Sequence, residues 1–343
     1  MHLLNGFFNA MNFVIVGAGA VGCYIGGRLA AGGQHVTLVG RPRMIEGLAR
    51  YGLTVTDLDG YKVHVQSRQL NLTTSLANVK MARPSLILLC VKGGATEAAA
   101  LQIAAFCPPG STVVSLQNGV DNVARIAAIA PHAHALAGMV PYNVVMPTAN
   151  HVHRASGGYL HIGSTALAHE IALLLNACGL STRLAKDMRP LQWGKLLINL
   201  NNPVNALSDL PLRAQLMDRD YRLVLAGLQQ EALAVMKRAG IKPAKIAAVP
   251  PRVLPHILRL PNWLFRLVAS RLLRIDDAAR SSMWDDVQQG RTTEIDDLCG
   301  AVVRLAAHHG MQAPRNVAMC KLLAVHRKGV RLTGPEMRKT AQP

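Results

Sequence analysis

The chain has 343 residues, half of them hydrophobic and 16% charged, a balance typical of globular proteins with a substantial apolar core. No uninterrupted run of 18 apolar residues occurs, which argues against a membrane-spanning helix, and the length suggests two domains. The formal net charge of +18 is spread over the whole length, and aromatic residues make up only 4% of the chain. Nucleic-acid binding would favour a basic patch with aromatic side chains for stacking, so we expect no nucleic-acid partner.

The cysteines and the first residues indicate the cellular compartment of the protein. Six cysteines are scattered along the chain without a CxxC pair, a pattern typical of a reducing compartment, so we expect a cytoplasmic protein. Residues 1–10 lack the basic start and the small-residue cleavage site of a secretory signal. We expect them to be a disordered leader or to precede the true start, because Met11 directly precedes the first strand.

The N-terminal half alternates short apolar strands with helices, as in an α/β domain built on a parallel sheet. Strands are predicted at residues 13–16 and 35–39, on either side of a helix that ends near Gly32. Further along, the pattern predicts a hairpin over 54–65, a buried strand over 85–91, a helix over 95–106, a strand over 112–116 and an edge strand over 182–184.

From Arg189 onward the periodicity of apolar residues becomes helical. Helices are predicted over residues 191–207, 212–239 and 295–308. The expected fold class is therefore α/β, with a dinucleotide-binding domain over residues 11–186 followed by an all-α substrate domain over residues 187–343.

The first strand is followed by a glycine-rich turn that opens the helix, Gly17-Ala18-Gly19-Ala20-Val21-Gly22. This is the context that a GxGxxG dinucleotide-binding motif requires. Gly17 permits the tight turn, Gly19 lets the backbone approach a pyrophosphate, and Gly22 lets helix and strand pack closely. Because unpaired N–H groups and the helix dipole favour an anion there, the turn predicts a Rossmann-type cofactor domain.

The end of the second strand distinguishes between cofactors. NAD enzymes place an acidic residue there, but this chain has Arg41 and no carboxylate before Glu46. An arginine can bind a ribose 2′-phosphate through charge-assisted hydrogen bonds, with Arg43 as a helper. We therefore predict NADP(H) as the cofactor. The alternative is that both arginines are solvated surface residues without a role in cofactor binding.

Residues 193–203 read WGKLLINLNNP and form the most informative stretch of the C-terminal half. On one continuous helix, Lys195, Asn199 and Asn202 are spaced i, i+4 and i+7 and share a face. Polar groups on an apolar helix are costly to bury without partners, so this face is either a substrate site or a set of interhelix hydrogen bonds. Glu294 opens another apolar helix, where a capping role alone is the alternative to a functional one.

Two pairs of histidines could contribute to a metal site. His132 and His134, and likewise His151 and His153, would place two imidazoles on one face of a strand. No cysteine or carboxylate completes either set, so no metal is predicted. The GxSxG elbow of many hydrolases is also absent from the sequence.

Five motifs occur in the order seen in ketopantoate reductases (2-dehydropantoate 2-reductases), which the chain resembles from Met11 to about Leu323: GAGAVG, Val91-Lys92, Gln117-Asn118-Gly119, WGKLLINLNN and SSM…GRTTEID. The resemblance implies reduction of 2-dehydropantoate to pantoate by NADPH, a step of pantothenate and coenzyme A biosynthesis. It implies that Lys195 is the general acid that protonates the ketone oxygen as hydride arrives. It also implies substrate contacts by Asn118, Asn199, Asn202 and Ser282, and cofactor contacts by Lys92, Asn118 and Glu294.

The chain departs from the family in two places. The family's Asn-Pro pair begins eight residues beyond the lysine, whereas Asn202-Pro203 comes one residue early, with Asn201 beside it. Helical phase favours Asn202 as the substrate contact, and Asn201 is the alternative. The segment 244–276 is longer than the corresponding segment of compact family members. It could form a packing helix, a lid, an oligomer contact or a membrane-surface helix.

Two alternatives to 2-dehydropantoate reduction stay open. The same fold and mechanism could act on another 2-oxo acid, because both departures touch the substrate pocket. A non-catalytic NADP(H)-sensing protein would also use the glycine-rich turn, but it would not need Lys195, Ser282 and Glu294. A homodimer is one alternative for the assembly.

Overall fold

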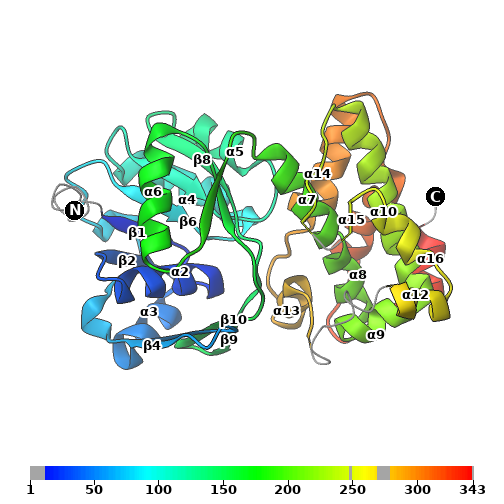
Figure 1. Ribbon diagram of the computed structural model, residues 1–343, viewed down its shortest axis with the longest axis horizontal. Coiled ribbons are helices and arrows are strands. Elements are labelled where there is room, and N and C mark those ends of the chain that lie inside the picture. The colour runs from blue at the N-terminus through cyan, green and yellow to red at the C-terminus, as the bar shows by residue number, and fades with distance from the viewer. Residues whose placement is uncertain (1–11, 247–248, 269–278, 342–343) are drawn as a thin grey trace. The chain divides into compact units, whose positions relative to one another are not determined.

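A computed structural model describes residues 12–246, 249–268 and 279–341 (Figure 1). These residues form two compact units. The first unit contains the described residues up to Gln117 together with Asp121–Met188, and the second contains Asn118–Val120 together with the described residues from Arg189 onward. The change of unit after Met188 compares with the expected boundary after residue 186. The expected leader at residues 1–10 lies outside the described residues.

The first unit is built on an eight-stranded sheet with the order β12-β11-β8-β7-β6-β1-β2-β5. The six strands from β8 to β5 are parallel to one another, and β11 runs antiparallel to β8. Strands β1 and β6 are buried along their whole length, as expected for a parallel sheet covered on both faces. The strands are β1 (Phe13–Val16), β2 (Val36–Val39), β5 (Asn71–Thr73), β6 (Leu86–Leu89), β7 (Thr112–Ser115), β8 (His134–Met139), β11 (Leu160–Gly163) and β12 (Thr182–Ala185).

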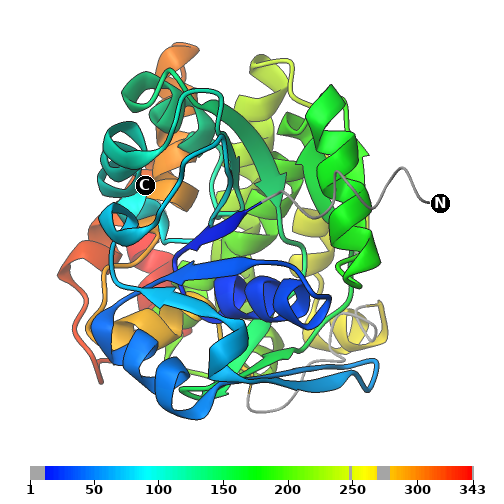
Figure 2. The same cartoon turned by 90° about the vertical axis from the view of Figure 1, so that its left-hand side faces the viewer.

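A second, four-stranded sheet has the order β4-β3-β10-β9. Its strands are β3 (Leu53–Asp57), β4 (Lys62–Val65), β9 (Val144–Thr148) and β10 (His151–Arg154). Helix α2 (Ala20–Ala31) contacts strands of both sheets and is the dark blue helix beside the blue strands in Figure 2. The other helices of this unit are α3 (Pro42–Tyr51), α4 (Thr96–Phe106), α5 (Asn122–Ile129) and α6 (Ala166–Ala177), with short 3₁₀ turns at Ser67–Gln69, Leu76–Asn78 and Gly93–Ala95.

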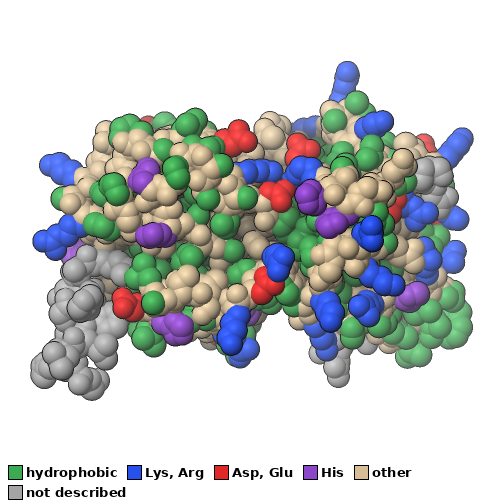
Figure 3. Space-filling model, turned by 90° about the horizontal axis from the view of Figure 1, so that it is seen from above, with side chains coloured by type: hydrophobic (Ala, Val, Ile, Leu, Met, Phe, Trp, Pro, Cys, Tyr) green, Lys and Arg blue, Asp and Glu red, His purple; other side chains and the backbone are tan. Residues whose placement is uncertain are grey.

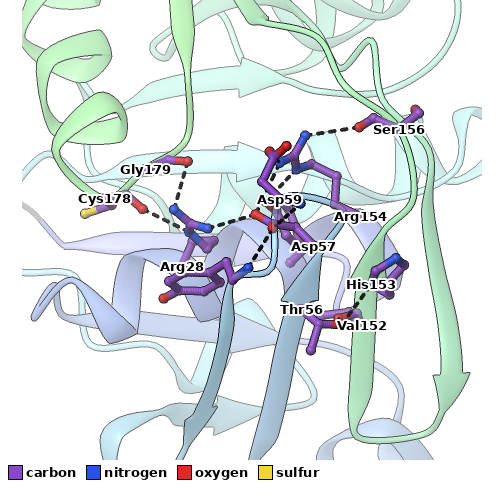
Figure 4. Close-up of polar contacts among 12 residues, drawn as sticks. Arg28, Thr56, Asp57, Asp59, Val152, His153, Arg154, Ser156, Cys178 and Gly179 are labelled. Atoms are coloured by element: carbon purple, nitrogen blue, oxygen red, sulfur yellow. Dashed lines mark hydrogen bonds and ion pairs between the residues drawn. The ribbon is translucent and has the colours of Figure 1, made fainter.

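A buried ion pair joins α2 to the smaller sheet (Figure 4). Arg28 of α2 donates from Nη1 to Asp57 Oδ2 at 3.3 Å, and its other nitrogens donate to the carbonyls of Cys178 and Gly179 at 3.1 and 3.0 Å. Arg154 of β10 donates to the same carboxylate oxygen at 3.2 Å. Because burial makes an unpaired charge expensive, these contacts fix helix, sheet and the α6–β12 loop together.

The Asp57 carboxylate is the centre of this cluster, so removing its charge should destabilise the first unit. Burial acts to raise the pKa of Asp57, but hydrogen bonds from the Tyr61 backbone and from Arg154 outweigh it and hold the pKa below its usual value. The stabilisation is therefore present at neutral pH and is lost as the pH falls through the lowered pKa. We expect Asp57→Asn to cost about 2–3 kcal/mol in the free energy of unfolding at pH 7.

Thermal unfolding followed by circular dichroism checks this prediction, with Asp59→Asn as the matched control. Asp59 also contacts Arg154, but its side chain is 66% exposed, so its charge is screened by water. A loss of stability no larger for Asp57→Asn than for Asp59→Asn would contradict the assigned role of the buried pair.

The second unit is a helical bundle around α10, which contacts α8, α9, α11, α14, α15 and α16. Its helices are α7 (Arg189–Asn199), α8 (Asn201–Ser208), α9 (Leu212–Met217), α10 (Arg219–Arg238), α11 (Leu254–Leu258), α12 (Asn262–Val268), α13 (Ser282–Gln288), α14 (Ile295–His308), α15 (Pro314–Val325) and α16 (Gly334–Ala341). The α/β unit followed by a helical unit confirms the expected fold class. In the described part of the chain, no helix is long and apolar enough to cross a membrane.

Within the long segment at 244–276, α11 and Phe265 of α12 pack on α10, whereas Trp263 and Leu267 of α12 are exposed. Arg222 of α10 is completely buried and donates to the carbonyls of Leu258 and Leu260 at 3.0 and 2.9 Å. Its guanidinium also lies 4.1 Å from the centre of the Phe265 ring. This arrangement corresponds to the packing-helix alternative for the residues concerned, while residues 247–248 and 269–276 lie outside the described residues.

The helix predicted over residues 191–207 is wrong in one respect, because the structure divides it into α7 and α8 at Leu200. Pro203 explains the break: a proline has no N–H to donate to the carbonyl four residues earlier, that of Asn199. A new helix can begin with proline in its first turn, where no such donor is needed. Asn202 therefore lies on α8, so its spacing from Lys195 crosses the boundary between two helices and is not that of one continuous helix.

Basic side chains are scattered over the face of the molecule drawn in Figure 3, where they alternate with hydrophobic and uncharged ones. Along the sequence, lysine and arginine occur over the whole length but are more frequent from Arg189 onward. On that face, the basic side chains are thus dispersed among other residue types.

Candidate active site

The glycine-rich turn connects β1 to α2 at the centre of the larger sheet. Gly17 has φ of +109°, and a Cβ there would lie 2.7 Å from the Cys90 backbone, so only glycine fits. A Cβ on Gly22 would lie 2.1 Å from the Gly17 carbonyl oxygen. By contrast, a Cβ on Gly19 would have nothing within 4 Å, which leaves open space above the start of α2. This cradle fits the pyrophosphate of a dinucleotide.

The carboxyl ends of β2 and β6 flank this turn. The backbone N–H groups of Gly17 and Ala18 donate to the Val39 carbonyl at 2.9 and 3.0 Å, which holds the turn against the end of β2. Arg41 follows two residues later, exposed at the start of α3, and Lys92 follows the end of β6. The turn, Arg41 and Lys92 thus gather where the strand order reverses about β1, the usual position of a ligand in such sheets.

In the second unit, Lys195 and Asn199 lie four residues apart on α7 and so share a face of that helix. Their neighbours Leu196 and Leu197 are buried in the apolar core of the bundle. The alternation of polar and apolar residues on α7 therefore separates a polar face from a packing face.

Glu294 occupies the N-cap position of α14, but its carboxylate makes no capping hydrogen bond there. Instead, Oε2 accepts a hydrogen bond of 2.9 Å from Asn118 Nδ2. The capping-only alternative is therefore wrong for this side chain. Asn118 follows β7 in sequence but belongs to the second unit, as Glu294 does. The two hydrogen-bond partners are 176 positions apart in the sequence.

The ammonium group of Lys195 is electrostatically linked to Glu294. Surrounding atoms remove much of its hydration, which lowers the pKa of Lys195 to about 8, while the negative charge of Glu294 acts in the opposite direction. A group with this pKa is largely protonated at neutral pH and still gives up its proton readily. Lys195 is thus suited to donate a proton.

The two neighbouring asparagines of α8 have different surroundings. The Asn201 amide exchanges two hydrogen bonds with the fully buried Gln215 amide, at 3.2 and 3.0 Å. The Asn202 backbone carbonyl accepts a hydrogen bond of 3.3 Å from Ser281 Oγ. Asn201 is therefore held by the packing of α8 on α9, whereas Asn202 lies beside the start of α13.

Ser282 is the first residue of α13 and its side chain is exposed. The preceding Ser281 is buried and caps the helix, since its Oγ accepts from the Trp284 backbone N–H at 3.2 Å. Ser281 therefore has a structural role, whereas Ser282 is exposed and does not cap the helix.

One of the two predicted histidine pairs lies on a strand and the other does not. His132 lies in a turn before β8, where its ring contacts the Cys107 carbonyl at 3.1 Å, so the expected strand pair with His134 is wrong. His151 and His153 both lie on β10, with ring nitrogens 2.8 and 2.9 Å from Thr56 Oγ1. Among the described residues, no group of three or more His, Cys, Asp or Glu side chains is arranged to hold a metal.

Sequence reasoning missed the anchoring role of Gln117. This side chain is buried, accepts from Ser115 Oγ at 3.0 Å and donates to Thr96 Oγ1 at 2.7 Å. It thereby fixes the end of β7 to the start of α4, directly before Asn118 leaves the first unit. A polar residue at the end of an apolar strand was the available signal.

Comparison with known proteins gives consistent results over both units. A family model described as ketopantoate reductase PanE/ApbA matches residues 13–166, and its C-terminal counterpart matches residues 187–327. The 2-dehydropantoate 2-reductase of Pyrococcus horikoshii is 28% identical over 320 residues, covering 91% of this chain and 96% of the relative. That of Halobacterium salinarum is 28% identical over 313 residues, covering 89% and 95%.

Solved structures agree in fold. A PanE/ApbA family ketopantoate reductase from Ralstonia eutropha has a TM-score of 0.78 and 26% identity, covering 97% of this chain and 100% of that one. D-mandelate dehydrogenase with NADH and anilino(oxo)acetate has a TM-score of 0.76 and 20% identity, covering 92% and 97%. Fold and site thus define an oxidoreductase that binds a nicotinamide dinucleotide. The chain belongs to the ketopantoate reductase PanE/ApbA family, which confirms the resemblance seen in its motifs.

Proposed function

We propose that the protein reduces 2-dehydropantoate to pantoate with NADPH, in the biosynthesis of pantothenate and coenzyme A. The observation that carries the proposal is Lys195, a lysine on the polar face of α7 whose pKa is lowered to about 8 and whose ammonium group interacts electrostatically with Glu294. The relatives named 2-dehydropantoate 2-reductase, which match over nearly their whole length, support the choice of substrate. The proposed place of action is the cytoplasm.

The first unit would hold the cofactor. Gly17 to Gly22 would receive the pyrophosphate, Lys92 would reach toward the ribose, and Arg41 would bind the 2′-phosphate that distinguishes NADPH from NADH. When bound, the reduced nicotinamide supplies hydride to the C2 carbonyl carbon of the substrate. The preference for NADPH is supported by the exposed Arg41 and by the absence of an acidic side chain at the end of β2.

Lys195 would act as general acid. As negative charge develops on the ketone oxygen, the ammonium group stabilises that charge and transfers its proton to the oxygen. Glu294 would keep Lys195 protonated, because its negative charge favours the ammonium form. Asn118, held by Glu294, would contact both substrate and cofactor.

Asn199, Asn202 and Ser282 would bind the carboxylate and hydroxyl oxygens of the substrate. Asn199 shares the face of α7 that carries Lys195, and the exposed Ser282 follows the buried cap of α13. Asn202 is preferred over Asn201 because both amide atoms of Asn201 are engaged by Gln215.

A pH profile tests the pairing of Lys195 with Glu294. We expect kcat/KM for reduction to be level below pH 8 and to fall about tenfold per pH unit above it, because the deprotonated amine cannot act as an acid. Glu294→Gln should move this alkaline limb to lower pH by about one unit, since the carboxylate raises the pKa. The control is Asp296→Asn, an exposed carboxylate in the first turn of α14. An alkaline limb that stays in place in Glu294→Gln would contradict the pairing.

Reduction of another 2-oxo acid is the second candidate, because D-mandelate dehydrogenase shares the fold and the fold alone does not select the acid. Steady-state NADPH oxidation with 2-dehydropantoate, pyruvate, 2-oxoisovalerate and benzoylformate separates the candidates. We expect the highest kcat/KM for 2-dehydropantoate. Turnover of another acid alone would replace the substrate but keep the mechanism, and tight NADPH binding without turnover would favour a sensing protein.

A dimeric ketopantoate reductase from Staphylococcus aureus shares the fold, and we propose a homodimer for this chain as well.

A further inference from the structure

Helix α13, which carries Ser282, is tied at its start to the C-terminal end of α8. The Ser281 backbone N–H donates to Asn205 Oδ1 at 2.9 Å. Asn205 is completely buried, and its Nδ2 donates to the Leu210 carbonyl at 2.9 Å. One buried amide therefore links the beginning of α13 to the turn that follows α8.

Asp209 ties the same helix one turn further along. Trp284 Nε1 donates to Asp209 Oδ1 at 2.6 Å, and Gln288 Nε2 approaches the same oxygen at 3.4 Å. The guanidinium of Arg280 lies 3.6 Å from this oxygen and 4.1 Å over the Trp284 ring. Over the described ranges, Asp209 is also the one non-glycine residue with a positive φ, at 51°. Asp is one of the few residues that tolerate this conformation, which ends α8.

These contacts matter because α13 has only seven residues and would not be stable as an isolated helix. Ser282 is exposed, so its own side-chain packing does not fix its position. Its place is set by the buried neighbours Ser281 and Met283, by Asn205 on α8 and by Asp209 directly after α8.

We propose that Asn205 and Asp209 are positioning residues that set the place of Ser282 and thereby the affinity of the enzyme for its 2-oxo acid. The inference rests on the proposed function, in which Ser282 binds the substrate. Both residues act through α13, so their loss should raise KM for the 2-oxo acid more than it lowers kcat, and should leave NADPH binding unchanged.

The test compares Asp209→Gly with Asp209→Asn. Glycine and asparagine both tolerate a positive φ, so the turn after α8 is kept in both variants, but only asparagine keeps an Oδ1 acceptor for Trp284. We expect Asp209→Gly to raise KM for the 2-oxo acid about tenfold, with kcat within about twofold of the wild type. Asp209→Asn should restore KM to within about twofold. Asn205→Ala should raise the same KM.

Hydrogen exchange over residues 282–288 provides a readout that does not depend on activity. It should accelerate in Asp209→Gly but not in Asp209→Asn. Asp218→Gly is the matched control, because it removes the N-cap of α10 in the same unit without touching α13. A normal KM in Asp209→Gly, or an equal rise in Asp218→Gly, would overturn the proposal. If the wild type does not reduce 2-dehydropantoate, the proposed function fails, while unchanged exchange in Asp209→Gly would overturn the anchoring itself.

Discussion

Lys195→Ala should lower kcat for 2-dehydropantoate reduction by about 10² to 10³, with little change in the KM for NADPH. Removing a general acid typically costs 10²- to 10⁴-fold, and this side chain would also stabilise the developing alkoxide. Lys195 lies on the polar face of α7, and its lowered pKa makes it a ready proton donor. Rapid-mixing measurement of NADPH absorbance gives the rate of the chemical step directly.

The matched control for this substitution is Lys237→Ala, an exposed lysine in the last turn of α10. It removes the same charge from the same unit, and its kcat should stay within about twofold of the wild type. Near-normal turnover by Lys195→Ala would remove the lysine from the proposed mechanism.

Arg41→Ala should raise KM for NADPH by about 10- to 100-fold and leave KM for NADH almost unchanged. Charge-assisted hydrogen bonds to a phosphate contribute about 1.5–3 kcal/mol, and only NADPH carries the 2′-phosphate. Arg41 is exposed at the start of α3, directly after the end of β2, where this phosphate is expected. Steady-state kinetics with both cofactors measures the change in preference.

Arg50→Ala serves as the control, because Arg50 lies in the last turn of the same helix and is also exposed. It should alter neither KM. Equal losses for NADPH and NADH in Arg41→Ala would show that Arg41 binds a part common to both cofactors, and the preference for NADPH would then need another source.

The first unit could be predicted largely from the sequence because its signals are local. The strand over 13–16 was predicted with the bounds that β1 has, and the glycine-rich turn has the positive φ at Gly17 that its motif requires. A fully apolar run and a turn that only glycine can form each depend on neighbouring residues. Tertiary contacts did not need to be known.

The second unit could be predicted less well, for physical reasons that differ between residues. Leu200 is a good helix former, so periodicity hid the break there, although Pro203 was a usable signal. The pairing of Asn118 with Glu294 joins residues 176 positions apart, and no local pattern encodes it. The same holds for Asn205 and Asp209, whose partners on α13 lie more than 70 residues away.

The most direct test of the proposed activity is the fate of the transferred hydrogen. The purified protein would be incubated with 2-dehydropantoate and NADPH that carries deuterium at both C4 positions of the nicotinamide, and the product analysed by mass spectrometry and NMR. We expect pantoate that carries one deuterium at C2. Pantoate without deuterium, or no pantoate while NADPH is oxidised, would contradict direct hydride transfer to this substrate.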